Sequence, residues 1–430
     1  MDRRQVLDVL KGSALAAAAW PLIREKPAHA TPSSRPRFYL HIIPQGGMDA
    51  VYSTDPKKIS EVDTGIDVPF GPGEIVETTG GGRLGPSFRA LARWTPRLAI
   101  VNAFRQNSAN HLSGLSNVMH CKSRSAPGSP TLMEILGGRR QREATGAISI
   151  GAAMPSAFTP AYLGEPGTLP FGNRPGLFEH LDKADPDGLV GAAKALRREA
   201  QLLGGARASA AQRTTAENLR SSAELFARVA VTPKFAPVDW GAEGKDSYRG
   251  VGPSENVYHN GRDLQRVLWL FEHGLTRCVT LCVGNQDFDS HIWNAAGQTI
   301  LVEYLALLLD RLFMELDRRM VDGRPLSEQT VVIVGSEIGR FPRLNGARGK
   351  DHFPQSPHLF YGPGLVTGAT YGATGRDMAG LPISLATGRP APGGHLLRVD
   401  DIGTTLLALD GANPELYGYT GKHLTFLTGT

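Results

Sequence analysis

Acidic and imidazole side chains recur at four places in the sequence, each of them shortly after a short apolar run. These residues are Asp49, His111, Asp289, His291, Glu337, Asp351 and His352. Carboxylate oxygens and imidazole nitrogens together suit Zn²⁺ or Mn²⁺ better than Ca²⁺. The pattern therefore predicts a divalent metal centre, with Zn, Mn, Mg and Ca left open as the ion.

The spacing within two of these groups favours chelation of one ion. Asp289 and His291 are two residues apart, so both side chains point to the same side of an extended segment. Asp351 and His352 form a second chelating pair in a loop rich in Gly and Pro. We expect both pairs to contribute ligands to the metal centre.

Asp49 and Glu337 follow the ends of two apolar runs. The turn Gly46-Gly47-Met48-Asp49 presents a carboxylate at a strand end, although such turns are more often purely structural. A carboxylate at the position of Glu337 would be costly to bury unpaired, and Arg340 could be its ion-pair partner instead of a metal. Both carboxylates remain predicted metal ligands.

His111 and Ser113 are the predicted catalytic residues. His111 could donate a proton or bind the oxyanion of a substrate. Ser113 or Ser108 could attack an ester, or a water activated by the metal could attack directly. Simple helix capping by Ser or Asn explains this segment equally well. His358 is a further histidine that we place in the polar loops.

The elements that must position these side chains alternate between strands and helices. Strands are predicted over 37–43, 98–101, 278–283 and 330–334, with helices over 88–94, 262–273 and 298–320. This alternation predicts an α/β fold with a mainly parallel sheet sandwiched by helices. Ligands bind outside the carboxyl ends of the strands in such sheets, which is where the polar residues fall.

A helical insertion is predicted over about residues 190–232. Leu196, Ala200 and Leu203 share one helical face, and so do Leu219, Ala223, Phe226 and Ala230. Gly204-Gly205 separates the two helices. We expect this pair to pack on the α/β domain, which would span residues 31–430.

Residues 1–30 have the pattern of a twin-arginine export signal. Arg3-Arg4 precedes a short apolar stretch, and Ala28-His29-Ala30 supplies the small residues of a cleavage site. The stretch is too short to span a bilayer, so we expect no stable membrane anchor. The sequence thus predicts a periplasmic or secreted protein.

Composition and charge exclude several classes of protein. The 430 residues are 41% hydrophobic and carry a formal net charge of +5, without a basic run interleaved with aromatics, so nucleic-acid binding has no support. Cys278 and Cys282 lie about 13 Å apart on one predicted strand and cannot pair there. Cys121 could pair with one of them, but we expect three buried free thiols.

These motifs occur in the order typical of a known exported family, and the chain resembles domain of unknown function 1501. The resemblance rests on the twin-arginine signal, Gly-Gly-Met-Asp, Phe-Asp-Ser-His, Ser-Glu-Ile-Gly-Arg and Gly-Lys-Asp-His, and spans about residues 38–409. That family is grouped with the alkaline phosphatase and sulfatase superfamily. The resemblance implies an alkaline phosphatase-like sheet with divalent metals at the strand ends.

The resemblance also implies roles for individual residues. Asp49 would stand where the superfamily has its first metal-binding Asp, and Asp289 with His291 would match its Asp/His pair. Superfamily hydrolases attack with a Ser, Thr or modified Cys at a helix start, whereas this sequence has Asn110 directly before the His where the family often has Ser. The sulfatase Cys-x-Pro-x-Arg motif is absent around Cys121.

Two functions follow from the sequence. The first is an exported metal-dependent hydrolase acting on a phosphate or related ester, with a small-molecule or polymer substrate. The second is a non-catalytic exported binding or surface protein on a hydrolase fold, with a structural metal ion and an exported protein as partner. The unassigned nucleophile keeps the second alternative open.

Overall fold

A central sheet of seven strands organises the computed structural model, which describes residues 36–71, 73–125, 129–139, 145–150, 185–230, 260–284 and 286–429. The predicted signal over residues 1–30 lies outside the described residues. The strands are β1 (Phe38–Pro44), β4 (Leu98–Arg105), β5 (Thr145–Ile150), β6 (Thr276–Val283), β9 (Thr330–Gly335), β12 (Gln355–Tyr361) and β13 (Ala369–Tyr371).

The strand order is β13-β4-β12-β9-β1-β6-β5. Strand β1 is parallel to both of its neighbours, with Tyr39 opposite Cys278 of β6 and Val331 of β9. Strand β5 is parallel to β6, and β13 is parallel to β4. Among the seven described strands of this sheet, β12 alone runs antiparallel to its neighbours, β9 and β4. The prediction of a mainly parallel α/β sheet is therefore confirmed.

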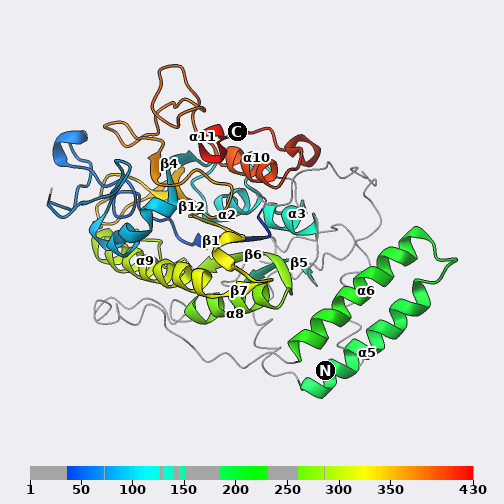
Figure 1. The fold of residues 1–430 in the computed structure, drawn as a ribbon. Coiled ribbons are helices and arrows are strands. Elements are labelled where there is room, and N and C mark those ends of the chain that lie inside the picture. The colour runs from blue at the N-terminus through cyan, green and yellow to red at the C-terminus, as the bar shows by residue number, and fades with distance from the viewer. Residues whose placement is uncertain are drawn as a thin grey trace.

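Helices cover both faces of the sheet (Figure 1). On one face lie α8 (Asn260–Glu272), α9 (Asn294–Arg318) and the 3₁₀ helix η2 (Pro86–Arg97). On the other lie α2 (His111–His120), α3 (Leu132–Gly138), α10 (Val399–Leu409) and α11 (Thr425–Thr428). Because both faces are covered, β1, β6 and β9 are buried along their whole length and are mostly apolar.

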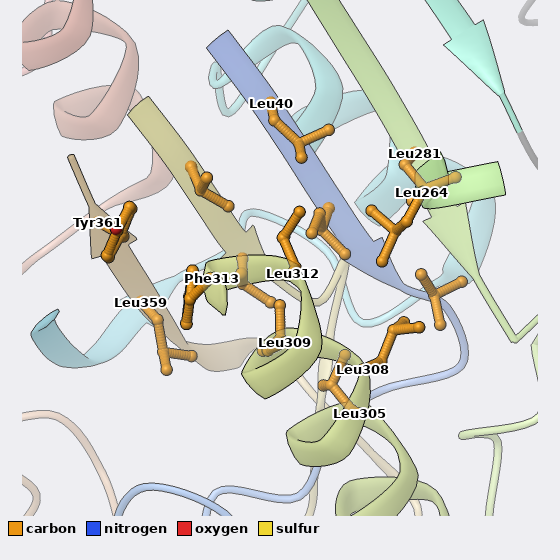
Figure 2. Packing of buried hydrophobic residues seen from close by; sticks show 14 of the residues in the cluster. Leu40, Leu264, Leu281, Leu305, Leu308, Leu309, Leu312, Phe313, Leu359 and Tyr361 are labelled. Carbon is orange, nitrogen blue, oxygen red and sulfur yellow. The ribbon is translucent and has the colours of Figure 1, made fainter. Parts of the chain in front are cut away.

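Figure 2 shows how α9 packs on the sheet. Leu305, Leu308, Leu309 and Leu312 recur at spacings of three and four, so they form one apolar stripe along the helix. The stripe faces side chains of β1, β6 and β12 that are themselves buried, Leu40, Leu281 and Leu359. This packing places the first residues of α9, from Asn294 onward, near the carboxyl ends of the strands.

Helices α5 (Pro186–Leu203) and α6 (Ala210–Val229) form an antiparallel pair that projects from the β5 side of the sheet (Figure 1). Their contact is a small cluster of buried residues, Ala193, Leu196, Ala200, Ala216, Leu219 and Ala223. Within the described part of the chain, no helix combines the length and the hydropathy that crossing a membrane requires.

Short elements complete the fold. They are η1 (Ile59–Glu61), β2 (Val76–Glu77), β3 (Arg83–Leu84), β7 (Met320–Val321), β8 (Arg324–Pro325), η5 (Leu326–Glu328), β10 (Gly339–Arg340), β11 (His352–Phe353) and η6 (Pro414–Tyr417). All three cysteines are free and buried, as predicted.

The placement of His358 in a polar loop is wrong. His358 lies in β12 and is fully buried. Its ring occupies the space that a side chain on Gly335 would need. A glycine on the neighbouring strand makes room for the ring. His358 therefore belongs to the interior of the sheet.

Candidate metal centre

Three side chains converge at the carboxyl ends of the strands. His111, Asp289 and His352 each offer one ligand atom, and these atoms all lie within 4.8 Å of one another. Nε2 of His111 is 3.3 Å from Oδ2 of Asp289, and Nε2 of His352 is 3.4 Å from Oδ1. The segments after β4, β6 and β9 supply one residue each, as the position of the predicted site requires.

His291 joins the same group. Its Nε2 lies 3.2 Å from Oδ1 of Asp289 and 2.9 Å from Nε2 of His352. We call His111, Asp289, His291 and His352 the His–Asp cluster. The two-residue spacing of Asp289 and His291 brings both side chains to one place, as the sequence predicted.

The other ring nitrogen of each histidine faces an oxygen. Nδ1 of His111 is 2.9 Å from Oε1 of Glu337, Nδ1 of His352 is 2.6 Å from the carbonyl oxygen of Ala109, and Nδ1 of His291 is 3.2 Å from Oδ1 of Asp351. A carbonyl or carboxylate oxygen accepts, so each Nδ1 carries the proton in a neutral ring. The lone pair of each Nε2 then points into the cluster.

This assignment leaves a gap in the hydrogen bonding that a cation fits. With both Nδ1 atoms protonated, the Nε2 atoms of His291 and His352 present lone pairs to each other at 2.9 Å. Nε2 of His111 is buried and faces Oδ2 of Asp289 at 3.3 Å. Three imidazole nitrogens around one carboxylate are the donor set of a zinc-type ion. The residues present therefore fit a divalent metal.

Glu337 is the most deeply buried acid of the site, with 2% of its side chain exposed. Its Oε1 also accepts a hydrogen bond from the backbone N–H of Gly46 at 2.7 Å, and Oε2 accepts one from the hydroxyl of Ser336 at 3.0 Å. The carboxylate is thus held from two strand ends while it orients His111. A carboxylate behind a metal-binding histidine fixes its tautomer and raises its basicity.

Arg340 is bound to Asp289 rather than to Glu337, which corrects the ion pair expected from the sequence. Its Nη2 lies 2.6 Å from Oδ1 of Asp289, and the guanidinium also donates to the carbonyl oxygens of Gly46, Gly47 and Lys350. The side chain is fully buried. Arg340 therefore fixes the position of Asp289 through Oδ1, the oxygen that also faces His291 and His352.

The glycine pair after β1 is required by close backbone contacts. Gly46 has a φ of +113°, and a Cβ there would lie 2.3 Å from the backbone nitrogen of Asp289. Gly47 has a φ of +102°, and a Cβ there would lie 2.8 Å from Nε of Arg340. The turn thus lets Asp289 and Arg340 approach β1 directly.

Charges within the cluster shift two pKa values strongly. Burial lowers the pKa of His111, but hydrogen bonds and charge from Asp289 and Glu337 outweigh burial and raise it to about 9. Burial raises the pKa of Asp289, but His111 and Arg340 bring it well below its usual range. The carboxyl groups of Asp289 and Glu337 therefore favour positive charge at His111, carried by a second ring proton or by a cation that replaces it at Nε2.

Comparison with known families identifies the chain. A model of the family described as protein of unknown function DUF1501 matches residues 38–423. The chain belongs to this family. The resemblance expected from the DUF1501 motifs is thereby confirmed. Among curated proteins, none matches the chain by sequence.

Several solved structures are similar to this DUF1501 protein at low sequence identity. The lipoteichoic acid synthase LtaP from Listeria monocytogenes is 10% identical, with a TM-score of 0.43, and the match covers 100% of this chain and 82% of that one. A mutant of the alkaline phosphatase PafA is 10% identical, with a TM-score of 0.45, covering 93% and 100%. The PsFucS1 sulfatase from Pseudoalteromonas is 12% identical, with a TM-score of 0.40, covering 100% and 76%.

Asp49 does not belong to the His–Asp cluster in this DUF1501 protein. Its Oδ2 lies 2.7 Å from Nζ of Lys350 and accepts a hydrogen bond from Nδ2 of Asn294 at 3.0 Å. Lys350 is fully buried and also lies 3.1 Å from Oδ2 of Asp67. An ammonium group is therefore the counter-ion of Asp49, where the sequence predicted a metal.

The other predicted residues lie around the cluster. Asp351 bonds to Nδ1 of His291, so it contacts a ligand candidate rather than the centre of the cluster. Ser113 is exposed on α2, and its hydroxyl makes no hydrogen bond within the described residues. Ser108 accepts from the backbone N–H of Asn110, whose side chain caps α2.

Sequence reasoning missed two groups in and around this centre. Lys350 stands directly before Asp351 in the quoted Gly-Lys-Asp-His motif, so its position was visible, but its partner Asp49 lies 301 residues away. The second group is the backbone carbonyl of Ala109, and no side-chain type in the sequence indicates that a carbonyl contacts a histidine. Only the fold brings it to His352.

Proposed function

We propose that this protein is an exported, metal-dependent hydrolase of a phosphate or related ester. A divalent ion is held by His111, Asp289, His291 and His352. The observation that carries the proposal is the convergence of three Nε2 atoms on one carboxylate while each Nδ1 is committed to an oxygen.

The donor set favours Zn²⁺ or Mn²⁺ over Mg²⁺ and Ca²⁺, because imidazole nitrogen outnumbers oxygen. The cluster also has an open side. The side chain of His291 is 43% exposed and that of Asp289 is 28% exposed, whereas His111 is 17% exposed. Catalytic zinc sites keep such an opening for water or substrate, whereas structural sites are closed.

Each residue of the site has its own role in the proposed reaction. A divalent ion bound here would supply Lewis acidity to an ester oxygen and to an attacking water. Glu337 holds His111, Asp351 orients His291, and Arg340 fixes Asp289. We assign His111 to metal binding instead of proton donation, because its Nε2 faces the other ligand candidates. Ser113 remains the candidate hydroxyl nucleophile, with water as the alternative.

A non-catalytic role with a structural ion is the second candidate. The observation that favours it is the side chain of Asn110, which caps α2 by accepting from the N–H groups of Leu112 and Ser113. This amide occupies the helix start where a hydroxyl nucleophile is expected. Under this alternative the protein binds an exported partner or a polymer at the cell surface.

Activity measurements on matched variants separate the two candidates. The purified protein, supplied with Zn²⁺ or Mn²⁺, is assayed with an aryl phosphate and an aryl phosphodiester. We expect turnover that His352→Ala and Asp289→Asn abolish while the fold is retained, and that His423→Ala, a histidine bonded to Thr428 outside the cluster, leaves unchanged. A metal-loaded protein without turnover of either ester would favour the structural ion.

Export is tested separately. We propose that residues 1–30 direct the chain through the twin-arginine route to the periplasm or the exterior. Replacing both Arg3 and Arg4 with Lys is expected to leave the precursor inside the cell, as measured by fractionation and immunoblotting. Processing and export of that variant at the normal rate would contradict the assignment.

A further inference from the structure

Large exposed apolar side chains closely follow residues of the His–Asp cluster, or Arg340 that binds it, in the sequence. Leu112 follows His111 and is 43% exposed, and Ile292 and Trp293 follow His291 and are 65% and 59% exposed. After Arg340 come Phe341 and Leu344, which are 38% and 46% exposed. Three segments that carry residues of the candidate site or their direct partners therefore also carry exposed apolar side chains, and such side chains commonly mark binding surfaces.

The backbone of Trp293 is held in a conformation that a bulky residue rarely adopts. Its φ is +50°, in the left-handed region, where it forms the N-cap of α9. Its N–H donates to the carbonyl oxygen of Ala347 at 3.3 Å, and the N–H of Asn294 donates to that of Arg348 at 2.9 Å. Such strain persists only where surrounding contacts impose it, and it concentrates at functional sites.

The loop over residues 345–349 imposes this conformation. Nδ2 of Asn345 donates to the carbonyl oxygen of His291 at 3.0 Å, and Oδ1 of Asn345 accepts from the N–H of Gly349 at 3.0 Å. A Cβ on Gly349 would lie 1.9 Å from the carbonyl carbon of His291, so only glycine fits. The loop is thus packed against the segment that carries both the ligand candidate His291 and the exposed ring.

A cation accompanies the apolar surface. Arg348 is exposed, and its guanidinium carbon lies 5.7 Å from the centre of the Trp293 ring. Asp351 is the exposed acid nearby, and its Oδ1 is already bonded to His291 and Asn345. This carboxylate is held at His291, whereas the guanidinium of Arg348 lies beside the Trp293 ring, where it can pair with the anionic part of a ligand that also has an apolar part.

We propose that Leu112, Ile292, Trp293, Phe341 and Leu344 bind the part of the substrate that is not hydrolysed, and that the substrate is an anionic phosphate ester with an alkyl or aryl group. Arg348 attracts the anion and the apolar side chains cover its hydrocarbon. This inference rests on the proposed hydrolase site and adds the chemical class of the substrate.

Binding of two soluble phosphate esters tests the inference. The zinc-supplied full-length protein is titrated calorimetrically with methyl phosphate and with decyl phosphate below its micellar concentration. One fully buried methylene improves affinity by about fourfold, so partial burial of the chain predicts decyl phosphate binding at least about tenfold more tightly. Equal affinity for the two esters would overturn the inference.

Variants test whether these apolar side chains cause the preference for decyl phosphate. Trp293→Asn removes the ring with a residue that tolerates left-handed backbone, and Ile292→Ser removes a neighbouring apolar side chain. Each is expected to reduce the decyl preference at least about threefold, with metal content and melting temperature unchanged. Leu202→Ser, on α5 and 74% exposed, serves as the control with the preference retained. A preference that survives both variants would place the ligand elsewhere and contradict the inference.

Two further outcomes distinguish the proposed substrate class from the proposed hydrolase activity on which it rests. Turnover of methyl and decyl esters with equal kcat/KM would leave the hydrolase in place and overturn the substrate class alone. A decyl preference lost in Trp293→Asn, in a protein without turnover, would support the binding surface while removing the hydrolase. Sedimentation with phosphatidylglycerol vesicles without discrimination between soluble esters would overturn the inference in favour of a membrane surface.

Discussion

Oε1 of Glu337 lies 2.9 Å from Nδ1 of His111, and this contact decides which nitrogen His111 presents to Asp289. The carboxylate is buried and accepts at the same time from the backbone N–H of Gly46. Because Nδ1 is committed, only Nε2 is left to bind an ion. The metal centre thus depends on an acid that does not itself belong to the His–Asp cluster.

Glu337→Gln is expected to weaken metal binding by about 10–100-fold, the usual effect of removing a carboxylate behind a metal-binding histidine. The amide keeps one acceptor oxygen, so the fold should survive. Competition against a chelator of known affinity measures the change. Glu315→Gln on α9, which loses ion pairs with Arg318 and Arg319, is the control. Equal metal affinity of Glu337→Gln and the native protein would remove Glu337 from the site.

Lys350→Met is expected to destabilise the fold by about 3–5 kcal/mol, because two carboxylates, those of Asp49 and Asp67, lose the buried ammonium between them. Urea unfolding measures the loss. Adding Asp49→Asn to Lys350→Met should recover part of it. Arg318→Met, which breaks an ion pair of an Arg that is 71% exposed, should cost at most about 1 kcal/mol. Similar costs for both variants would contradict the role of Lys350.

Gly46→Ala is expected to cost more than about 2 kcal/mol and to reduce metal content, because the new Cβ would meet the backbone of Asp289. Gly323→Ala is the matched control, since Gly323 also has a positive φ but nothing lies near its Cβ position. It should lose about 1–2 kcal/mol from backbone strain and keep the metal. Normal metal content in Gly46→Ala would show that the close approach is dispensable.

His41 and His358 are buried histidines whose ring nitrogens lack hydrogen-bond partners within the described residues. Burial lowers the pKa of His41 to about 4, and burial together with the nearby His41 lowers that of His358 to about 3. A lowered histidine pKa means that the unfolded chain, titrating near 6.5, binds protons first as the pH falls. Stability is therefore lost from about pH 6.5 downwards, until the folded groups also titrate.

His358→Leu tests this pH dependence. At pH 5 each buried histidine lowers the free energy of unfolding by about 2 kcal/mol relative to pH 7 and above. The variant should therefore lose about 2 kcal/mol less between pH 7 and pH 5 than the native protein, as urea unfolding at both values would show. Identical losses in the two proteins would contradict the assignment of a buried, neutral His358.

The sheet was predictable from sequence where strands are fully buried and apolar. Cys278 to Val283 and Thr330 to Val334 are such runs, and both form the expected parallel strands. Strand β12 was missed. Its first half contains Ser356, Pro357 and His358, so its apolar residues follow neither the alternation of a strand nor the period of a helix. His358 is buried there because Gly335 and Phe104 on the neighbouring strands accommodate its ring, and spacing along the sequence does not show these contacts.

The candidate site was predictable to a similar extent. Parallel strands end at one edge, so the side chains after β4, β6 and β9 had to meet, and His111, Asp289 and His352 do so. Which carboxylate would find an ammonium partner was not predictable, because Asp49 and Lys350 meet only through the packing of α9 and the loop after β9.

The central claim is that the His–Asp cluster holds one divalent ion. The most direct measurement is elemental analysis of the purified protein after exposure to Zn²⁺ and Mn²⁺ and removal of unbound metal, beside His352→Ala. We predict about one equivalent of metal per native chain and less than about 0.2 equivalents in the variant. Less than about 0.2 equivalents in the native protein, or undiminished metal in His352→Ala, would contradict the account.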